Sequence, residues 1–157
     1  MLGGEQLILN LKTMKTQTVV TDVTKGDLVN LLSTAHYGSY WLGLDYKAGN
    51  NTNQNGSFED KLASILLEGK KIVFIDFNVD DEEDVYGNLP HHFNKSEGAM
   101  YYDVTLKDIE TGIAKAFDKG GFENQCANYL VYEPENLDLY EAEALMQMCV
   151  FGELIYG

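Results

Sequence analysis

Residues 71–79 read Lys71-Ile72-Val73-Phe74-Ile75-Asp76-Phe77-Asn78-Val79 and carry the strongest strand signal in the chain. Every second residue from position 73 to position 79 is apolar, a period of two that is typical of a strand with one buried face. Residues 100–104 repeat this alternation after a long polar connection. We therefore expect the two segments to pair as antiparallel strands, with residues 73, 75, 77 and 79 facing the core.

Four segments around these strands begin with the same helix-start chemistry, a capping side chain followed three residues later by an acid. The four pairs are Thr24 and Asp27, Ser57 and Asp60, Thr105 and Asp108, and Asp138 and Glu141. Apolar residues recur at helical spacing behind each pair, and glycine follows the second and third segments. The sequence therefore predicts an α+β fold, with one layer of four helices on a small antiparallel sheet.

The length of the chain fits a single globular domain spanning residues 1–157. Residues 7–11 and 16–20 are β-favouring runs and predict an opening hairpin. Residues 47–56 form a polar segment with nothing to pack, which predicts a loop.

The charge balance excludes several classes of partner. The chain has eleven lysines, no arginine and 25 acidic residues, which gives a formal net charge of −14. A negative potential of that size repels nucleic acid and anionic membranes and attracts cationic partners. No apolar run approaches the roughly 20 residues that cross a bilayer. We expect neither direct nucleic-acid binding nor a membrane location.

Five consecutive acids follow the strongest strand: Asp80, Asp81, Glu82, Glu83 and Asp84. Carboxylates suit a hard cation, yet the EF-hand pattern fails because Asp81 and Gly87 occupy its glycine and final glutamate positions. A solvated loop that keeps the sheet edge soluble is one interpretation. The second interpretation is a partner-binding acidic surface that also includes Glu141 of the last helix. The functional hypothesis depends on this second interpretation.

The sequence offers no catalytic or metal-binding signature. His91 and His92 are neighbours in a predicted loop, and no further ligand stands at metal-site spacing. Cys126 and Cys149 are too few for a disulfide framework and are expected to be free thiols. We therefore predict no catalytic residues, no metal and no cofactor. A metal-dependent hydrolase at the acidic loop is the least supported alternative.

An aromatic segment follows the first helix and carries two interpretations. It contains His36, Tyr37, Tyr40 and Trp41 around Gly38, and Trp41 is the only tryptophan. Aromatic side chains on a flexible turn can stack on a nucleotide base, which makes these four residues candidate ligand-binding residues. The alternative is a core plug, in which Tyr40 and Trp41 fold under the sheet, because large aromatic side chains are buried on average.

The end of the chain is unusually apolar. Residues 151–157 read Phe151-Gly152-Glu153-Leu154-Ile155-Tyr156-Gly157. Apolar side chains left in water would form a patch of the kind found at interfaces. We expect Leu154 and Tyr156 to be buried, either beside the strand at residues 72–79 or across a homodimer interface.

From Thr21 onward the chain resembles a family of small proteins common in bacteriophages and prophages of Gram-positive hosts. Members typically read Ala-Leu-Glu-Gly-Gly and then Tyr-Trp after a first helix, and end in Phe-Gly-Glu, two aliphatic residues, an aromatic residue and Gly. The matches here are Ala35, Gly38, Tyr40, Trp41 and the segment 151–157, whereas His36-Tyr37 replaces the usual Leu-Glu. The resemblance implies a phage accessory protein in the cytoplasm of the bacterial host, and no particular reaction.

These observations lead to two functional hypotheses. In the first, the protein inhibits a host defence factor, as an anti-CRISPR protein does, by placing its acidic surface on a basic, nucleic-acid-handling site. In the second, it sequesters a nucleotide immune signal at Tyr37, Tyr40 and Trp41. The absence of arginine counts against the second hypothesis, although helix N-termini can hold phosphate without one.

Overall fold

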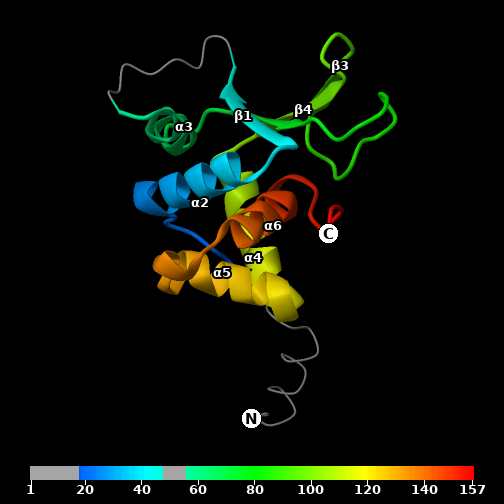
Figure 1. The fold of residues 1–157 in the computed structure, drawn as a ribbon. Helices are drawn as coiled ribbons and strands as arrows, with labels where there is room; N and C mark the ends of the chain where they lie inside the picture. The colour runs from blue at the N-terminus through cyan, green and yellow to red at the C-terminus, as the bar shows by residue number, and fades with distance from the viewer. Residues whose placement is uncertain (1–17, 48–55) are drawn as a thin grey trace, which may run out of the picture.

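The computed structural model describes residues 18–47 and 56–157 and has an α+β fold, as the sequence predicts (Figure 1). Within these ranges the α-helices are α2 (Lys25–Gly38), α3 (Phe58–Leu67), α4 (Leu106–Lys119), α5 (Gly121–Tyr132) and α6 (Leu139–Val150), with a short 3-10 turn, η2 (Pro134–Asn136). The strands are β1 (Leu42–Tyr46), β2 (Ile72–Asp76), β3 (His91–Asn94) and β4 (Ala99–Val104). Helices α2, α4, α5 and α6 stack on one side of the sheet.

The sheet is antiparallel with the strand order β1-β2-β4-β3. The predicted pairing of β2 with β4 is confirmed, and Phe74 lies opposite Tyr102. The predicted inward face of β2 is wrong. Ile72 and Phe74 face the main core, whereas Val73 and Ile75 pack on the other side with Ala99.

The physical reason for this error lies in the central position of β2. A strand paired on both edges can be covered on both faces, so its apolar alternation does not show which face meets the helices. The strand also ends at Asp76, and Phe77 is 46% exposed.

All four predicted helix starts are confirmed, and each has a complete capping box in which side chain and backbone bond reciprocally. Helix α5 was missed. It begins at Gly121, directly after Gly120 at the end of α4, and these two glycines have φ angles of +62° and +80°. This glycine pair makes a corner between two helices, and α5 begins without a side-chain cap that the sequence could reveal.

The two edge strands were also missed. Strand β1 begins one residue after Trp41, within the predicted aromatic turn, and β3 contains His91 and His92, which were expected in a loop. Short edge strands of four or five residues depend on a neighbouring strand for their hydrogen bonds, so local sequence predicts them poorly.

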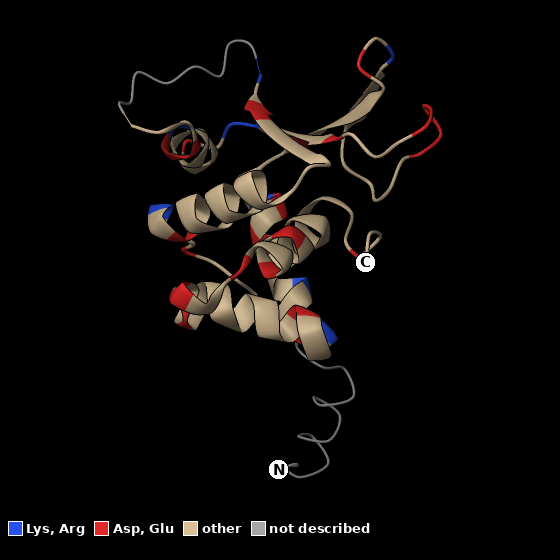
Figure 2. Ribbon diagram, in the orientation of Figure 1, with Lys and Arg blue, Asp and Glu red and all other residues tan. Residues whose placement is uncertain are grey.

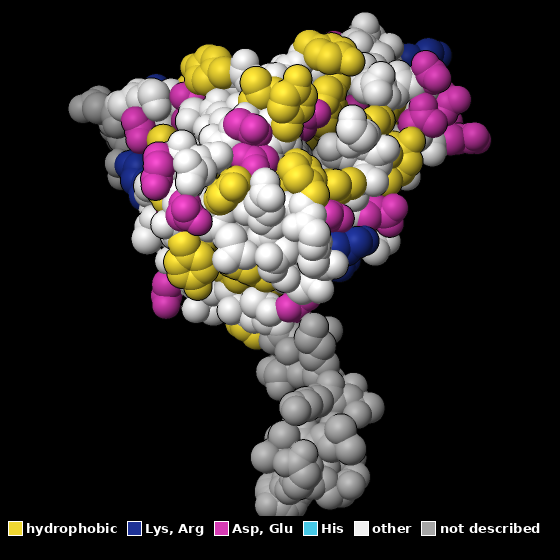
Figure 3. Space-filling model, turned by 60° about the horizontal axis from the view of Figure 1, so that its bottom comes forward, with side chains coloured by type: hydrophobic (Ala, Val, Ile, Leu, Met, Phe, Trp, Pro, Cys, Tyr) yellow, Lys and Arg dark blue, Asp and Glu magenta, His cyan; other side chains and the backbone are white. Residues whose placement is uncertain are grey.

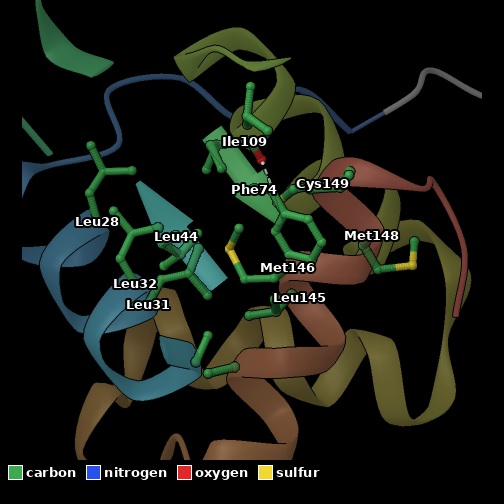
Figure 4. Packing of buried hydrophobic residues seen from close by; sticks show 14 of the residues in the cluster. Leu28, Leu31, Leu32, Leu44, Phe74, Ile109, Leu145, Met146, Met148 and Cys149 are labelled. Carbon is green, nitrogen blue, oxygen red and sulfur yellow. Dashed lines mark hydrogen bonds between the residues drawn. The ribbon is translucent and has the colours of Figure 1, made fainter. Parts of the chain in front are cut away.

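The core lies between the sheet and the helices (Figure 4). Phe74 of β2 points toward α6, near Leu145 and Met146, and the leucines of α2 complete the opposite side. Helices α4 and α6 approach closely at Gly112, where an added Cβ would collide with the backbone of Cys149.

The predicted N-terminal hairpin lies mostly outside the described residues. Its last three residues, 18–20, are described and belong to no strand. The predicted loop at 47–56 is likewise mostly outside them. No helix in the described ranges is long and apolar enough to cross a membrane.

Candidate functional site: the acidic loop and the aromatic junction

The five acids follow β2 on a loop that projects beyond the sheet (Figure 2). Two of the carboxylates hold the loop in shape. Asp84 Oδ2 accepts the backbone N–H of Asp80 at 2.7 Å and that of Asp81 at 3.4 Å. Asp81 Oδ1 accepts the N–H of Glu83 at 2.8 Å. The side chains of Asp80, Glu82 and Glu83 are exposed and form none of these bonds.

Apolar residues on both sides anchor the loop to the core. Val79, Val85 and Tyr86 pack against the main hydrophobic cluster. The backbone N–H of Tyr86 donates to the hydroxyl of Tyr102 at 3.2 Å, and its ring lies 5.6 Å from that of Phe151. The loop therefore presents its three outward carboxylates on a fixed base.

Glu141 does not belong to this surface. It is only 5% exposed, caps the first turn of α6, and accepts a hydrogen bond from Gln125 Nε2 at 3.0 Å. Its prediction as a partner-binding residue is wrong, because a capping acid in the third helical position bends back over the helix start. Within the described residues, no group of three or more His, Cys, Asp and Glu side chains could hold a metal ion.

The structure separates the residues of the aromatic segment. Trp41 is only 6% exposed and fills the core, as the core-plug interpretation predicts. Its ring centroid lies 4.7 Å from that of Tyr156, and its Nε1 donates to Glu143 of α6. The same interpretation is wrong for Tyr40, which is 96% exposed because the chain passes through a bend here, before β1 begins.

The predicted nucleotide site at this segment is not formed. His36 lies half-buried, with Nδ1 3.4 Å from a carboxylate oxygen of Glu59. Trp41 offers no face for stacking, and neither of the two pockets described below is lined by His36, Tyr37, Tyr40 or Trp41. The geometry therefore does not support nucleotide stacking at this segment.

The larger pocket has a volume of about 660 Å³ and lies between residues 18–21 and α4. Its charged lining consists of Lys107, Lys115, Glu110 and Asp118, which carry both signs. Asp118 accepts a hydrogen bond from the backbone N–H of Thr18 at 3.0 Å and so fixes one wall. A smaller pocket of about 190 Å³ lies between α4 and residues 87–89. None of the sequence-predicted site residues lines either pocket.

The C-terminal tail folds back onto the strand end from which the acidic loop begins. Gln147 is 3% exposed, and its Oε1 accepts the backbone N–H groups of Ile155 and Tyr156 at 2.8 and 2.9 Å. Its Nε2 donates to the carbonyl of Tyr156 at 3.0 Å. The predicted burial of Leu154 and Tyr156 is only partial: both are half-buried and pack against the main core cluster. Of the two, Tyr156 contacts the end of this strand, through Asp76. Sequence reasoning missed Gln147, because a single glutamine on an apolar helix face has no distinctive pattern.

Tyr156 joins the tail to a buried carboxylate. Its hydroxyl donates to Asp76 Oδ2 at 2.7 Å and lies 3.1 Å from the carbonyl oxygen of Asn78. Burial raises the pKa of Asp76 above its usual range, although hydrogen bonds from Tyr156 and from the N–H of Asn78 oppose this effect. Burial, followed by the bond to Asp76, raises the pKa of Tyr156. This cluster positions residues 76–78 immediately before the acidic loop.

Both cysteines are buried free thiols. Burial raises the pKa of Cys126 to about 12 and also raises the pKa of Cys149. A thiol must lose its proton to act as a nucleophile, so neither cysteine is poised for catalysis.

Comparison of the chain with protein-family models, curated proteins and solved structures finds no match.

Proposed function

We propose that the protein is a phage-type accessory protein that binds and inhibits a host defence factor through its acidic loop. The observation that carries this proposal is the geometry of residues 80–84, in which Asp81 and Asp84 shape the backbone while Asp80, Glu82 and Glu83 face solvent. A loop whose backbone is already fixed loses little backbone conformational freedom on binding, which favours association with a basic groove.

The charge around the loop supports the same partner chemistry. Residues 72–94 contain no lysine, and the chain contains no arginine. The outward carboxylates of the loop therefore have no cationic neighbour within this stretch. They can take the place of phosphates on a protein surface that normally binds nucleic acid. An inhibitor of a CRISPR effector would be one instance of this class.

The test compares two variants with equal changes in charge. One variant neutralises the outward carboxylates of the loop (Asp80→Asn, Glu82→Gln, Glu83→Gln). The control neutralises three exposed acids elsewhere (Glu68→Gln, Glu133→Gln, Glu135→Gln). Tagged wild-type protein and both variants are used to capture partners from host lysate, and association rates with the captured protein are measured over a salt series.

We expect the loop variant to associate at least tenfold more slowly than the wild type at low salt, and the control to associate within about twofold of it. The wild-type rate should fall steeply with salt, because exposed charges are screened beyond about 8 Å at physiological ionic strength. Equal rates for the two variants, or a rate that is insensitive to salt, would refute the proposal.

A further inference from the structure

Four apolar side chains remain in solvent where the end of α2 meets the start of α6. Tyr40 is 96% exposed, Tyr37 76%, Tyr140 71% and Leu139 37%. We call these four residues the aromatic patch. Large aromatic side chains are mostly buried in soluble proteins, so a group of exposed ones marks an interaction surface.

Two contacts place the end of α2 and the residues after it against the start of α6. An added Cβ at Gly38 would collide with Leu139, which places the end of α2 directly against the start of α6. Tyr37 and Tyr40 lie on either side of this glycine contact, and Tyr140 follows Leu139 in the chain. Trp41 then bonds to Glu143, one helical turn beyond Tyr140. The tyrosines therefore stand on buried, packed elements.

Tyrosine suits a binding surface for a physical reason. Its side chain has only two rotatable bonds before the hydroxyl, so it offers a large contact area at low entropic cost. The faces of its ring are electronegative and attract cations, arginine more often than lysine.

The charge of the surrounding segments is complementary to a cation. Residues 33–46 and 133–157, which build the patch and its base, contain no lysine. They do contain acids close to Leu139 and Tyr140 along the chain: Asp138 is exposed although it also caps α6, whereas Glu143 is half-buried and bonded to Trp41. Figure 3 shows hydrophobic side chains interspersed with acidic ones on the face that it presents.

We infer that the aromatic patch binds an arginine-bearing segment of a protein partner, with guanidinium groups stacked on Tyr37, Tyr40 and Tyr140. The patch supplies short-range contacts, whereas the acidic loop attracts the partner from a distance. The inference rests on the proposed function only because it expects a basic partner. Binding of arginine side chains at the aromatic patch does not require the acidic loop.

The test uses hexa-arginine amide as the probe in 150 mM salt, where long-range attraction is screened. Two-dimensional amide NMR spectra of the full chain are recorded during the titration. We expect chemical-shift changes concentrated at residues 37–41 and 139–143. Combined Tyr37→Ala, Tyr40→Ala and Tyr140→Ala substitutions should raise the Kd at least tenfold. The corresponding phenylalanine variant, which keeps the rings, should stay within about threefold of the wild type.

Tyr132→Ala is the matched control, because Tyr132 has the same 71% exposure as Tyr140 but lies at the end of α5. It should leave the Kd unchanged within about twofold.

Shift changes confined to residues 80–84 would overturn the inference and leave the proposed function standing. Changes at the patch without changes at the loop would support the inference and count against the loop as the binding site. Patch signals that shift with protein concentration alone would show self-association and overturn the inference.

Discussion

The acidic loop and helix α6 both carry acids, but most of the loop acids and the acids of α6 have different roles. In the loop, Asp80, Glu82 and Glu83 face solvent. In α6, Glu141 caps the helix and Glu143 accepts a hydrogen bond from Trp41. A count of acids along the sequence therefore overstates the acidic surface that a partner can meet. Helix α6 uses both of its acids, Glu141 and Glu143, to hold the fold together.

The difference has a simple physical origin. The acids of α6 lie on a helix that packs between α2, α4 and α5, where a carboxylate must find a hydrogen-bond donor. The acids of the loop follow the end of a strand, where the chain leaves the core and water solvates them. Four predictions test how far this contrast holds.

The largest effect should come from removing the tail that α6 holds. A chain that ends at Glu153 loses the half-buried Leu154, Ile155 and Tyr156 and leaves the amide of Gln147 buried without its partners. We expect a loss of about 3–5 kcal/mol in the free energy of unfolding. Urea titration followed by tryptophan fluorescence measures this loss directly, because Trp41 packs on Tyr156.

Deletion of Gly157 alone is the control and should leave the midpoint of unfolding in place. A chain ending at Glu153 that unfolds at the wild-type urea concentration would show that the tail does not stabilise the fold.

The second prediction compares one acid from each region. Glu141→Ala removes half of a capping box and the partner of Gln125, and should cost about 1–2 kcal/mol in the free energy of unfolding. Glu82→Ala removes an exposed carboxylate and should change this free energy by less than about 0.5 kcal/mol. Equal costs in thermal or urea unfolding would remove the distinction between the two regions.

The third prediction concerns pH. The raised pKa of Asp76 means that the folded state binds its proton more tightly than the unfolded state, so ionisation of this group costs stability. The protonated Asp76 therefore contributes stability at low pH. This stability is lost as the pH rises from the usual carboxyl pKa through the raised pKa of Asp76.

Asp76→Asn removes this titration and keeps an oxygen for the hydroxyl of Tyr156. As the pH rises from the usual carboxyl pKa through the raised pKa of Asp76, the free energy of unfolding of the variant should fall less, or rise more, than that of the wild type. Urea midpoints measured between pH 3.5 and pH 7 test the sign. Parallel profiles for the two proteins would contradict the prediction.

The smallest effect is expected for the loop itself. The triple variant Asp80→Asn, Glu82→Gln and Glu83→Gln should change the free energy of unfolding by less than about 0.5 kcal/mol, because none of these side chains holds the backbone. Asp84→Ala should cost more, since its carboxylate accepts two backbone N–H groups. A triple variant as destabilised as Asp84→Ala would show that the outward acids are structural.

Local signals in the sequence were enough for the helix starts and for the pairing of the two main strands. A capping box involves residues three positions apart, and strand alternation involves neighbours, so both appear without knowledge of the fold. The same locality applies at the candidate site. A run of five acids is visible in any context, and the exposure of Asp80, Glu82 and Glu83 agrees with it, while their role in partner binding stays a prediction. Glu141 was misassigned because its burial depends on contacts with α5.

The sequence alone determined the α+β class, four of the helices, the central strand pair, the large negative charge and the apolar character of the tail. Only the tertiary structure decided which face of β2 meets the helices, that Gly120 and Gly121 turn the chain into another helix, and that Trp41 lies inside while Tyr40 lies outside. The reason is common to all three. Each depends on contacts between residues far apart in the chain, and burial is a property of those contacts and not of residue type.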